Sequence, residues 1–186
     1  MRFKIIPQKV NVYMKYTKYF LDKNLINRII RCMDKVDAQI LRLLIADSHI
    51  TNSKLAKQIG LSESATLERV KRLEAAKIIR RYTIEVDLAK IGRSLEVFIT
   101  FTLKNQHVEE IDSFMQAMQD LDEVLSCAQV LGRFDFVAHV AVRDIEALQQ
   151  FINNKLIPLG SIARMESLTV LKMVKRIHQP NPVESE

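Results

Sequence analysis

The chain has 186 residues, 48% of them hydrophobic and 27% charged, so it can form one large domain or two small ones with real cores. Its apolar runs are far shorter than the roughly 20 residues of a membrane-spanning helix, and no signal-peptide pattern opens the N-terminus. Its two cysteines, Cys32 and Cys127, are too few for a disulfide framework and lack metal-ligand spacing. These features argue against membrane and secreted proteins, and we expect the protein in the cytoplasm.

The net charge of +6 is concentrated towards the N-terminus. Residues 1–32 carry eight basic residues against one acidic residue, and residues 33–93 carry twelve against eight. Residues 94–186 carry eight basic residues against thirteen acidic ones. Because phosphate attraction supplies most of the nonspecific affinity for DNA, this distribution favours a nucleic-acid partner. Taken alone, it is equally compatible with a merely solvated basic surface.

The first element in chain order is a basic extension over residues 1–32, which carries no motif. Met33 stands directly before a globular pattern, so the extension could originate from an alternative start codon. A helix is expected from Asp34 to Ala46. Its apolar stripe comprises Val36, Ile40, Leu43 and Leu44.

Residues 51–73 predict two short helices joined by a tight turn. Their apolar faces comprise Leu55, Ala56 and Ile59 in the first helix, and Leu67, Val70 and Leu73 in the second. Gly60 suits the left-handed conformation that often ends a helix, and Ser62 suits an N-cap. This pattern is typical of a helix-turn-helix, whose second helix enters the DNA major groove. The unit is expected to span residues 33–79.

A linker over residues 80–93 follows, in which we expect a strand from Arg81 to Asp87 and a break near Gly92. The pattern of residues 94–178 then predicts the order β-α-β-β-α-β. The expected strands cover 95–104, 123–131, 134–142 and 163–175, and the expected helices cover 107–119 and 144–157. Residues 179–186 are expected to be a tail. The predicted fold class is α+β, with a winged-helix-like helix-turn-helix domain followed by a ferredoxin-like domain.

Alternation along the expected strands assigns the two faces of the sheet. The inner face of the first strand comprises Leu95, Val97, Ile99, Phe101 and Leu103, and Cys127 is expected in the core. The outer face comprises Glu96, Phe98, Thr100, Thr102, Val137, His139, Ala141, Leu171 and Met173. Half of the outer face is apolar, which predicts that a second copy of the chain covers it in a homodimer.

Four stretches of the chain resemble the leucine-responsive regulator/AsnC family, also called feast/famine regulatory proteins. They are DKVDAQILRLL, LAKQIGLSESATLERVKRLEAAKIIRRYT, LGRFDF and IPLGSIARMESLTVLK, in matching order across residues 33–175. The resemblance implies a bacterial or archaeal transcription regulator with an amino-acid effector. It also implies dimers that often assemble into octamers. Residues 1–32 depart from the family pattern, which usually starts near Met33.

Candidate DNA-binding residues lie on the second helix of the helix-turn-helix. They are Ser62, Glu63, Ser64, Glu68, Arg69, Lys71 and Arg72. Ser64 can bond to base edges, and Glu68 can accept from cytosine N4. Lys71 and Arg72 suit phosphates. Arg69 matches the arginine in the family's LERV run and could contact phosphate or pair with an acid such as Glu74.

The turn after the second expected strand resembles the family's Gly-x-x-Asp effector loop. Its candidate effector-binding residues are Leu131, Gly132, Arg133 and Asp135, with Gln129, Glu166 and Thr169 as weaker neighbours. A glycine allows a ligand close to the backbone, and Asp135 could pair with the ammonium group of an amino acid. The alternative is an ordinary hairpin turn in which Asp135 pairs with a cation of the protein.

Two other functions remain open. GRFDFV faintly resembles the aromatic strand of RNA-recognition folds, although Phe134 and Phe136 alternate onto the expected core face. Sirohaem decarboxylases resemble this family, but His139 and Arg133 are the only weak candidates for handling a tetrapyrrole. The four histidines are scattered, so neither a metal site, nor acid–base catalysis, nor a cofactor is expected.

Overall fold

The computed structural model describes residues 33–176, which fall into two compact units. One holds residues 33–85 with 175–176, and the other holds residues 86–174. The expectations for residues 1–32 and 179–186 lie outside the described residues. We describe each unit by itself.

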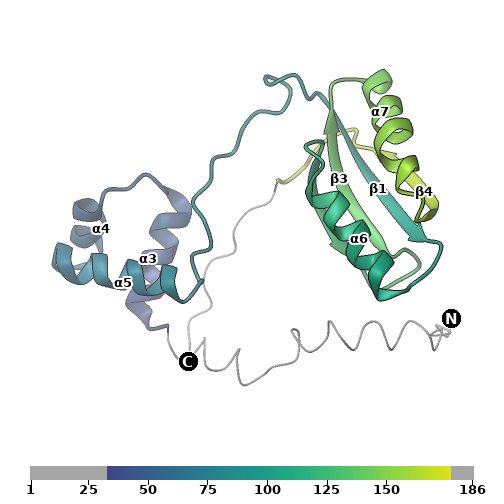
Figure 1. Ribbon diagram of the computed structural model, residues 1–186. Coiled ribbons are helices and arrows are strands. Elements are labelled where there is room, and N and C mark those ends of the chain that lie inside the picture. Colours follow the sequence, from purple (N-terminus) through teal and green to yellow (C-terminus); the bar gives the residue numbers. More distant parts are fainter. Residues whose placement is uncertain (1–32, 177–186) are drawn as a thin grey trace, which may run out of the picture. The chain divides into compact units, whose positions relative to one another are not determined.

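The first unit contains three helices, α3 (Lys35–Ala46), α4 (Asn52–Ile59) and α5 (Glu63–Ala75) (Figure 1). Its core consists of Ile40, Leu55 and Leu73, one side chain from each helix, and each is at most 2% exposed. The apolar stripes expected for α3 and α4 are confirmed, because Ala56 is buried and their other members pack against this core. The helix-turn-helix is therefore present where the sequence predicts it.

The turn between α4 and α5 has the backbone geometry that its residues predict. Gly60 ends α4 in the left-handed region, at φ 72°. Ser62 caps α5, and its hydroxyl accepts a hydrogen bond of 3.2 Å from the amide of Ala65. Two residues thus fix where the second helix begins.

The apolar face expected for α5 is wrong at one position. Leu67 is 44% exposed, whereas the neighbouring Thr66 is fully buried. Thr66 can occupy the core because its hydroxyl donates to the backbone oxygen of Ser62 at 2.9 Å, which satisfies its polar group. In the first half of α5, Thr66 therefore takes the buried position predicted for Leu67, while Leu73 and Val70 keep theirs.

No strand forms over residues 81–87, contrary to the sequence prediction. The alternating side chains of Tyr82, Ile84 and Val86 are all exposed. A strand requires a hydrogen-bonded neighbour, and within residues 33–176 this segment has none. The hydroxyl of Tyr82 instead donates to Glu74 at 2.9 Å. Partial burial, followed by this hydrogen bond, raises the pKa of Tyr82 to about 12.

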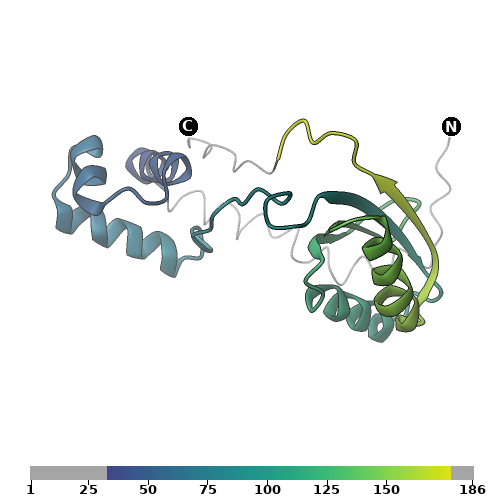
Figure 2. The same ribbon diagram turned by 90° about the horizontal axis from the view of Figure 1, so that it is seen from above.

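The second unit is a four-stranded antiparallel sheet with both helices on one side (Figures 1 and 2). Its elements are β1 (Leu95–Leu103), α6 (Val108–Gln119), β2 (Val124–Gln129), β3 (Phe136–Val142), α7 (Ile145–Phe151) and β4 (Ile162–Thr169). A π-helical turn (Ile152–Leu156) and a 3₁₀ turn (Ile157–Leu159) continue α7. The strand order β2-β3-β1-β4 confirms the ferredoxin-like arrangement.

The two central strands supply most of the core beneath the helices. Alternate residues of β1 from Val97 and of β3 from Phe136 are at most 4% exposed, as the alternation predicts. Phe114 of α6 contacts the rings of Phe101 and Phe136, with centroids 5.2 Å and 4.7 Å away.

Two expectations for the sheet edges are corrected. β4 ends at Thr169, so Leu171 and Met173 lie beyond the sheet, and Leu171 is 98% exposed. Cys127 is exposed rather than in the core. It lies on β2, which is an edge strand with a neighbour on one side only. An alternating pattern assigns a face but does not reveal whether a helix extends over the edge of that face.

Asp135 ties the β2–β3 turn to the end of β1. Its carboxylate is 5% exposed and accepts from the amide of Leu103 at 2.9 Å and from the side chain of Gln106 at 3.0 Å. Its own amide donates to the backbone oxygen of Phe101 at 2.8 Å. A buried carboxylate is stable only when donors of this kind replace its water.

We predict that Asp135→Ala lowers the free energy of unfolding by about 2–4 kcal/mol, because two hydrogen bonds to a charged group are lost and both donors are left unpaired. Denaturant unfolding of the full chain measures the change. Asp122→Ala, which removes an exposed acid of the same unit, should change stability by under about 0.5 kcal/mol. Equal stability of the two variants would contradict this account of Asp135.

Candidate functional site

The surface of α5 opposite its buried face is polar and open. With 100° per residue, Ser64, Glu68 and Lys71 lie on the side of the helix opposite Thr66 and Leu73. All three are exposed. We call these three residues the exposed stripe. The stripe offers a hydroxyl, a carboxylate and an ammonium group along one line.

The start of α5 is anchored to α4. The amide of the Asn52 side chain donates to the backbone oxygen of Glu63 at 2.8 Å. The hydroxyls of Ser62 and Ser64 lie 3.2 Å apart. Ser62 and Glu63 are both exposed. The first turn of α5 therefore lies at the surface with its backbone position fixed from the neighbouring helix.

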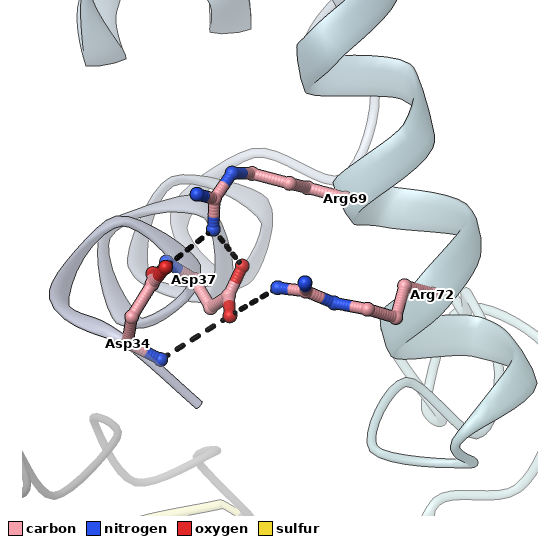
Figure 3. Close-up of polar contacts among 4 residues, drawn as sticks. All are labelled: Asp34, Asp37, Arg69 and Arg72. Atoms are coloured by element: carbon pink, nitrogen blue, oxygen red, sulfur yellow. Dashed lines mark hydrogen bonds and ion pairs between the residues drawn. The ribbon is translucent and has the colours of Figure 1, made fainter. Parts of the chain in front are cut away.

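Arg69 and Arg72 point towards α3 and not along the exposed stripe (Figure 3). Nη1 of Arg69 lies 2.7 Å from Oδ2 of Asp34 and 2.9 Å from Oδ1 of Asp37. Nη2 of Arg72 lies 2.7 Å from Oδ2 of Asp37. We call these four residues the charge cluster. It joins the N-terminus of α3 to the second half of α5.

Hydrogen bonds at the start of α3 position the two acids of the cluster independently of the arginines. The amide of Asp37 donates to the Asp34 side chain at 2.8 Å, and the amide of Asp34 donates back to Asp37 at 3.2 Å. This reciprocal capping box holds both carboxylates at the positive end of the helix dipole. The same residues therefore cap α3 and bind α5.

The ion pairs shift the pKa values of Arg69 and Asp34 in the directions that favour their charged forms. The side-chain bond to Asp34, followed by that to Asp37, raises the pKa of Arg69. Burial raises the pKa of Asp34, but the amide of Asp37 and the guanidinium of Arg69 outweigh it, so this pKa is lowered. Arg69 thus pairs with acids, as one of the two alternatives expected, but these acids are Asp34 and Asp37 and not Glu74.

Sequence reasoning missed the charge cluster and two lysines. The signal for the cluster was available, because two acids three residues apart on α3 match two arginines three residues apart on α5. Lys54 and Lys57, also three residues apart, are exposed on α4. The sequence prediction included only residues of the second helix, whereas the first helix of such a motif crosses the DNA backbone.

The expected effector turn is exposed at three of its four candidate residues. Leu131 is 80% exposed, Gly132 and Arg133 are also exposed, and the Arg133 guanidinium lies 4.8 Å from the ring centroid of Phe134. Gly132 does not have a positive φ, and a Cβ there would meet no atom within 4 Å. A side chain at Gly132 would therefore not strain the turn.

Of the remaining candidate effector residues, Asp135 and Gln129 lie at this turn, and Glu166 and Thr169 do not. The Asp135 carboxylate is buried and accepts hydrogen bonds from Leu103 and Gln106, so it stabilises the turn from its buried side. Gln129 belongs to β2, which lies at the opposite edge of the sheet from the β4 residues Glu166 and Thr169. These two also differ in face, because they are three residues apart in one strand.

Phe136 lies in the core, at 1% exposed, which agrees with the expected core face. Phe134 precedes β3, lies in the turn and is only partly buried, so its assignment to that strand's core face is wrong. Among residues 33–176, no three histidine, cysteine, aspartate or glutamate side chains gather in a way that could hold a metal ion. No helix of the same residues is long and apolar enough to cross a membrane.

Comparison with known families matches both units of the chain. Residues 33–74 match the AsnC-type helix-turn-helix domain, and residues 96–180 match the Lrp/AsnC ligand binding domain. The Bkd operon transcriptional regulator of Pseudomonas aeruginosa is 33% identical over 142 residues, which cover 76% of this chain and 93% of that protein. The leucine-responsive regulatory protein of Escherichia coli K12 is 33% identical over 144 residues, or 77% and 88% of the two chains.

Solved structures of similar proteins share the fold. AsnC of E. coli has a TM-score of 0.73 at 29% identity, over 81% of this chain and 99% of that one. A transcriptional regulator of Neisseria meningitidis, solved as a complex with L-Met, has a TM-score of 0.75 at 28% identity. That similarity covers 80% of this chain and 96% of the regulator.

Proposed function

The chain belongs to the Lrp/AsnC family of transcription regulators, and from this premise we propose that it binds duplex DNA through α5 and responds to an amino acid. The observation that carries the proposal is the exposed stripe of Ser64, Glu68 and Lys71 on the second helix of a helix-turn-helix. In such motifs this helix lies in the major groove with its N-terminal residues at base edges.

Each residue of the stripe has a role that its chemistry suits. Ser64 lies nearest the start of α5 and can donate to or accept from a base edge, and Glu68 can accept from cytosine N4. Lys71 is a mobile point charge suited to a phosphate. Lys54 and Lys57 of α4 add two further cations for the backbone. Ser62 and Glu63 flank the groove at the first turn.

We predict that Ser64→Ala with Glu68→Ala changes which DNA sites the protein selects, whereas Lys71→Ala weakens all sites alike. Lys71→Ala should also reduce the slope of log affinity against log salt concentration by about one, because one phosphate contact is lost. Selection from a random duplex pool and fluorescence anisotropy at several salt concentrations measure both effects.

Lys104→Ala, which removes an exposed cation of the other unit, is the matched control and should leave the salt slope unchanged. If the double variant selects the same sites as the parent protein, Ser64 and Glu68 do not contact bases.

The amino-acid effector is proposed to bind at the β2–β3 turn, around Leu131, Gly132 and Arg133. These residues are exposed, and the backbone at Gly132 is open to a close approach. The Arg133 guanidinium can pair with a carboxylate of the ligand. The L-Met complex of the Neisseria regulator supports an amino acid as the ligand class. Asp135 contributes by holding the turn.

We predict that Gly132→Ala keeps the melting temperature of the parent, because a Cβ there meets no neighbour and the backbone is unstrained. Gly132→Ala should lower the affinity for the effector about tenfold or more, because the new methyl group occupies space that the ligand needs. A thermal-shift screen of the twenty amino acids identifies the ligand, and calorimetry gives its affinity.

Gly92→Ala provides the opposite control. The φ of 80° at Gly92 strains an alanine, so this variant should have a lower melting temperature than the parent but bind the ligand with the parent's affinity. An identified amino acid that binds Gly132→Ala with the parent's affinity would place the effector site elsewhere.

A second copy of the chain is proposed to cover the outer face of the sheet. The helices cover only the inner face, and the outer face presents Phe98 stacked on His139, with ring centroids 4.6 Å apart. Leu168, paired with Phe98 in the sheet register, is 56% exposed. Two copies related by a two-fold axis would cover this face and pair two copies of α5 for a near-palindromic site. Octamers would be assemblies of such dimers.

We predict that Leu168→Asp shifts the protein from dimers or larger assemblies towards monomers, because it places a charge in the proposed contact. Light scattering at micromolar concentration measures the mass. Ile145→Asp changes an equally exposed residue, 61% exposed, at the start of α7 on the helix side, and should keep the parent mass. A parent protein that is monomeric, or a Leu168→Asp variant with unchanged mass, would contradict the proposed interface.

The relatives are named as regulators, which favours a regulator over an enzyme of the same architecture. We accordingly propose no catalytic residue and place the protein in the cytoplasm, where its DNA lies.

A further inference from the structure

Asp37 lies on α3, away from the exposed stripe, yet it is bonded to both arginines of α5. We propose that Asp37 is a positioning residue for DNA recognition, which holds Arg72 so that its remaining donors meet one backbone phosphate. The inference rests on the proposed binding of DNA through α5. It assigns a role in that binding to a residue that itself touches no DNA.

The burial of Asp37 makes this contact obligatory. Its side chain is 0% exposed, and one oxygen faces Arg69 while the other faces Arg72. A buried carboxylate without its cations is strongly destabilised. The position of Asp37 therefore fixes the positions of the two guanidinium groups. Because they stand three residues apart on α5, the two bonds fix the rotation of that helix about its axis.

The two arginines differ in how far their guanidinium groups can bind a second anion while they are paired to Asp37. Arg69 is bound by two acids and is 26% exposed, whereas Arg72 is 55% exposed and, within residues 33–176, is ion-paired to Asp37. A guanidinium has five N–H donors in one plane, so Arg72 can bond to a second anion while it keeps Asp37. Arg72 is therefore the member of the cluster that can contact DNA.

The place for that second anion is a shallow hollow beside α5. Its walls are Ala65, Glu68, Arg69 and Arg72, which follow one another at helical spacing. The hollow lies between the charge cluster and Glu68 of the exposed stripe. A phosphate there would bond to Arg72 while Ser64 and Glu68 face the groove. Glu68 in the same wall repels a phosphate, so the direction of Arg72, set by Asp37, decides whether the contact forms.

The test is a double-mutant cycle of Asp37→Asn and Arg72→Gln in the full chain. Affinities are measured for a duplex that the parent selects from a random pool and for a scrambled duplex of the same composition. Asp37→Asn should weaken binding to both duplexes about tenfold and lower the salt slope by about one, because Arg72 loses its fixed direction and with it the phosphate contact. Asp47→Asn, the same change at an exposed position of the same unit, should keep the parent's affinities and salt slope. In the Arg72→Gln background, the weakening caused by Asp37→Asn should fall below about threefold.

A purely structural role for Asp37 predicts the same weakening in both backgrounds, and that result would overturn the proposal, as would equal affinities and salt slopes for Asp37→Asn and Asp47→Asn. If circular dichroism shows that Asp37→Asn does not fold, Arg72→Gln alone decides. It should weaken both duplexes and lower the salt slope by about one, and a parent-like slope would overturn the proposal. Failure of the parent to select any duplex would instead count against the proposed function.

Discussion

A buried carboxylate needs donors that replace its water, and in the helical unit Asp37 obtains them from two arginines of α5. This single requirement links the N-terminus of α3, the capping box and the second half of α5 (Figure 3). The apolar core of this unit has one fully buried large side chain from each helix, so it alone leaves α5 some freedom to rotate. The directed bonds from Arg69 and Arg72 remove that freedom, because a rotation of one residue would separate both arginines from Asp37. The faces of α5 are thus assigned by charge as much as by hydrophobicity, which accounts for a buried Thr66 beside an exposed Leu67.

The sheet unit uses a similar device for a different purpose. Asp135 is likewise a buried carboxylate, and it accepts hydrogen bonds from the backbone amide of Leu103 and the side-chain amide of Gln106. These bonds tie the turn to a strand end, while Arg133 in the same turn is exposed. In both units a buried acid holds the element that presents the proposed binding residues. The exposed groups can then differ in chemistry while their positions remain fixed.

The fold followed from the sequence wherever local rules are strong. Gly60 and Ser62 act at the helix ends that they predict, and alternation in β1 and β3 identifies the core face. Prediction failed where the outcome depends on a neighbour. The segment 81–87 has the alternation of a strand but no hydrogen-bonded partner within the described residues, and Cys127 faces an edge that lies open. For the candidate site, the exposed stripe follows from helical periodicity. The pairing of Arg69 and Arg72 with α3 required a long-range contact, which spacing suggests but does not specify.

The central claim is that α5 binds the DNA major groove while the charge cluster keeps it in place. A structure of the full chain bound to a duplex that it selects tests this most directly. The account predicts Ser64 and Glu68 at base edges, Arg69 still bonded to Asp34 and Asp37, and Arg72 bonded to both Asp37 and a phosphate. A complex in which α5 lies outside the groove, or in which both arginines have left Asp37 for the DNA, would contradict it.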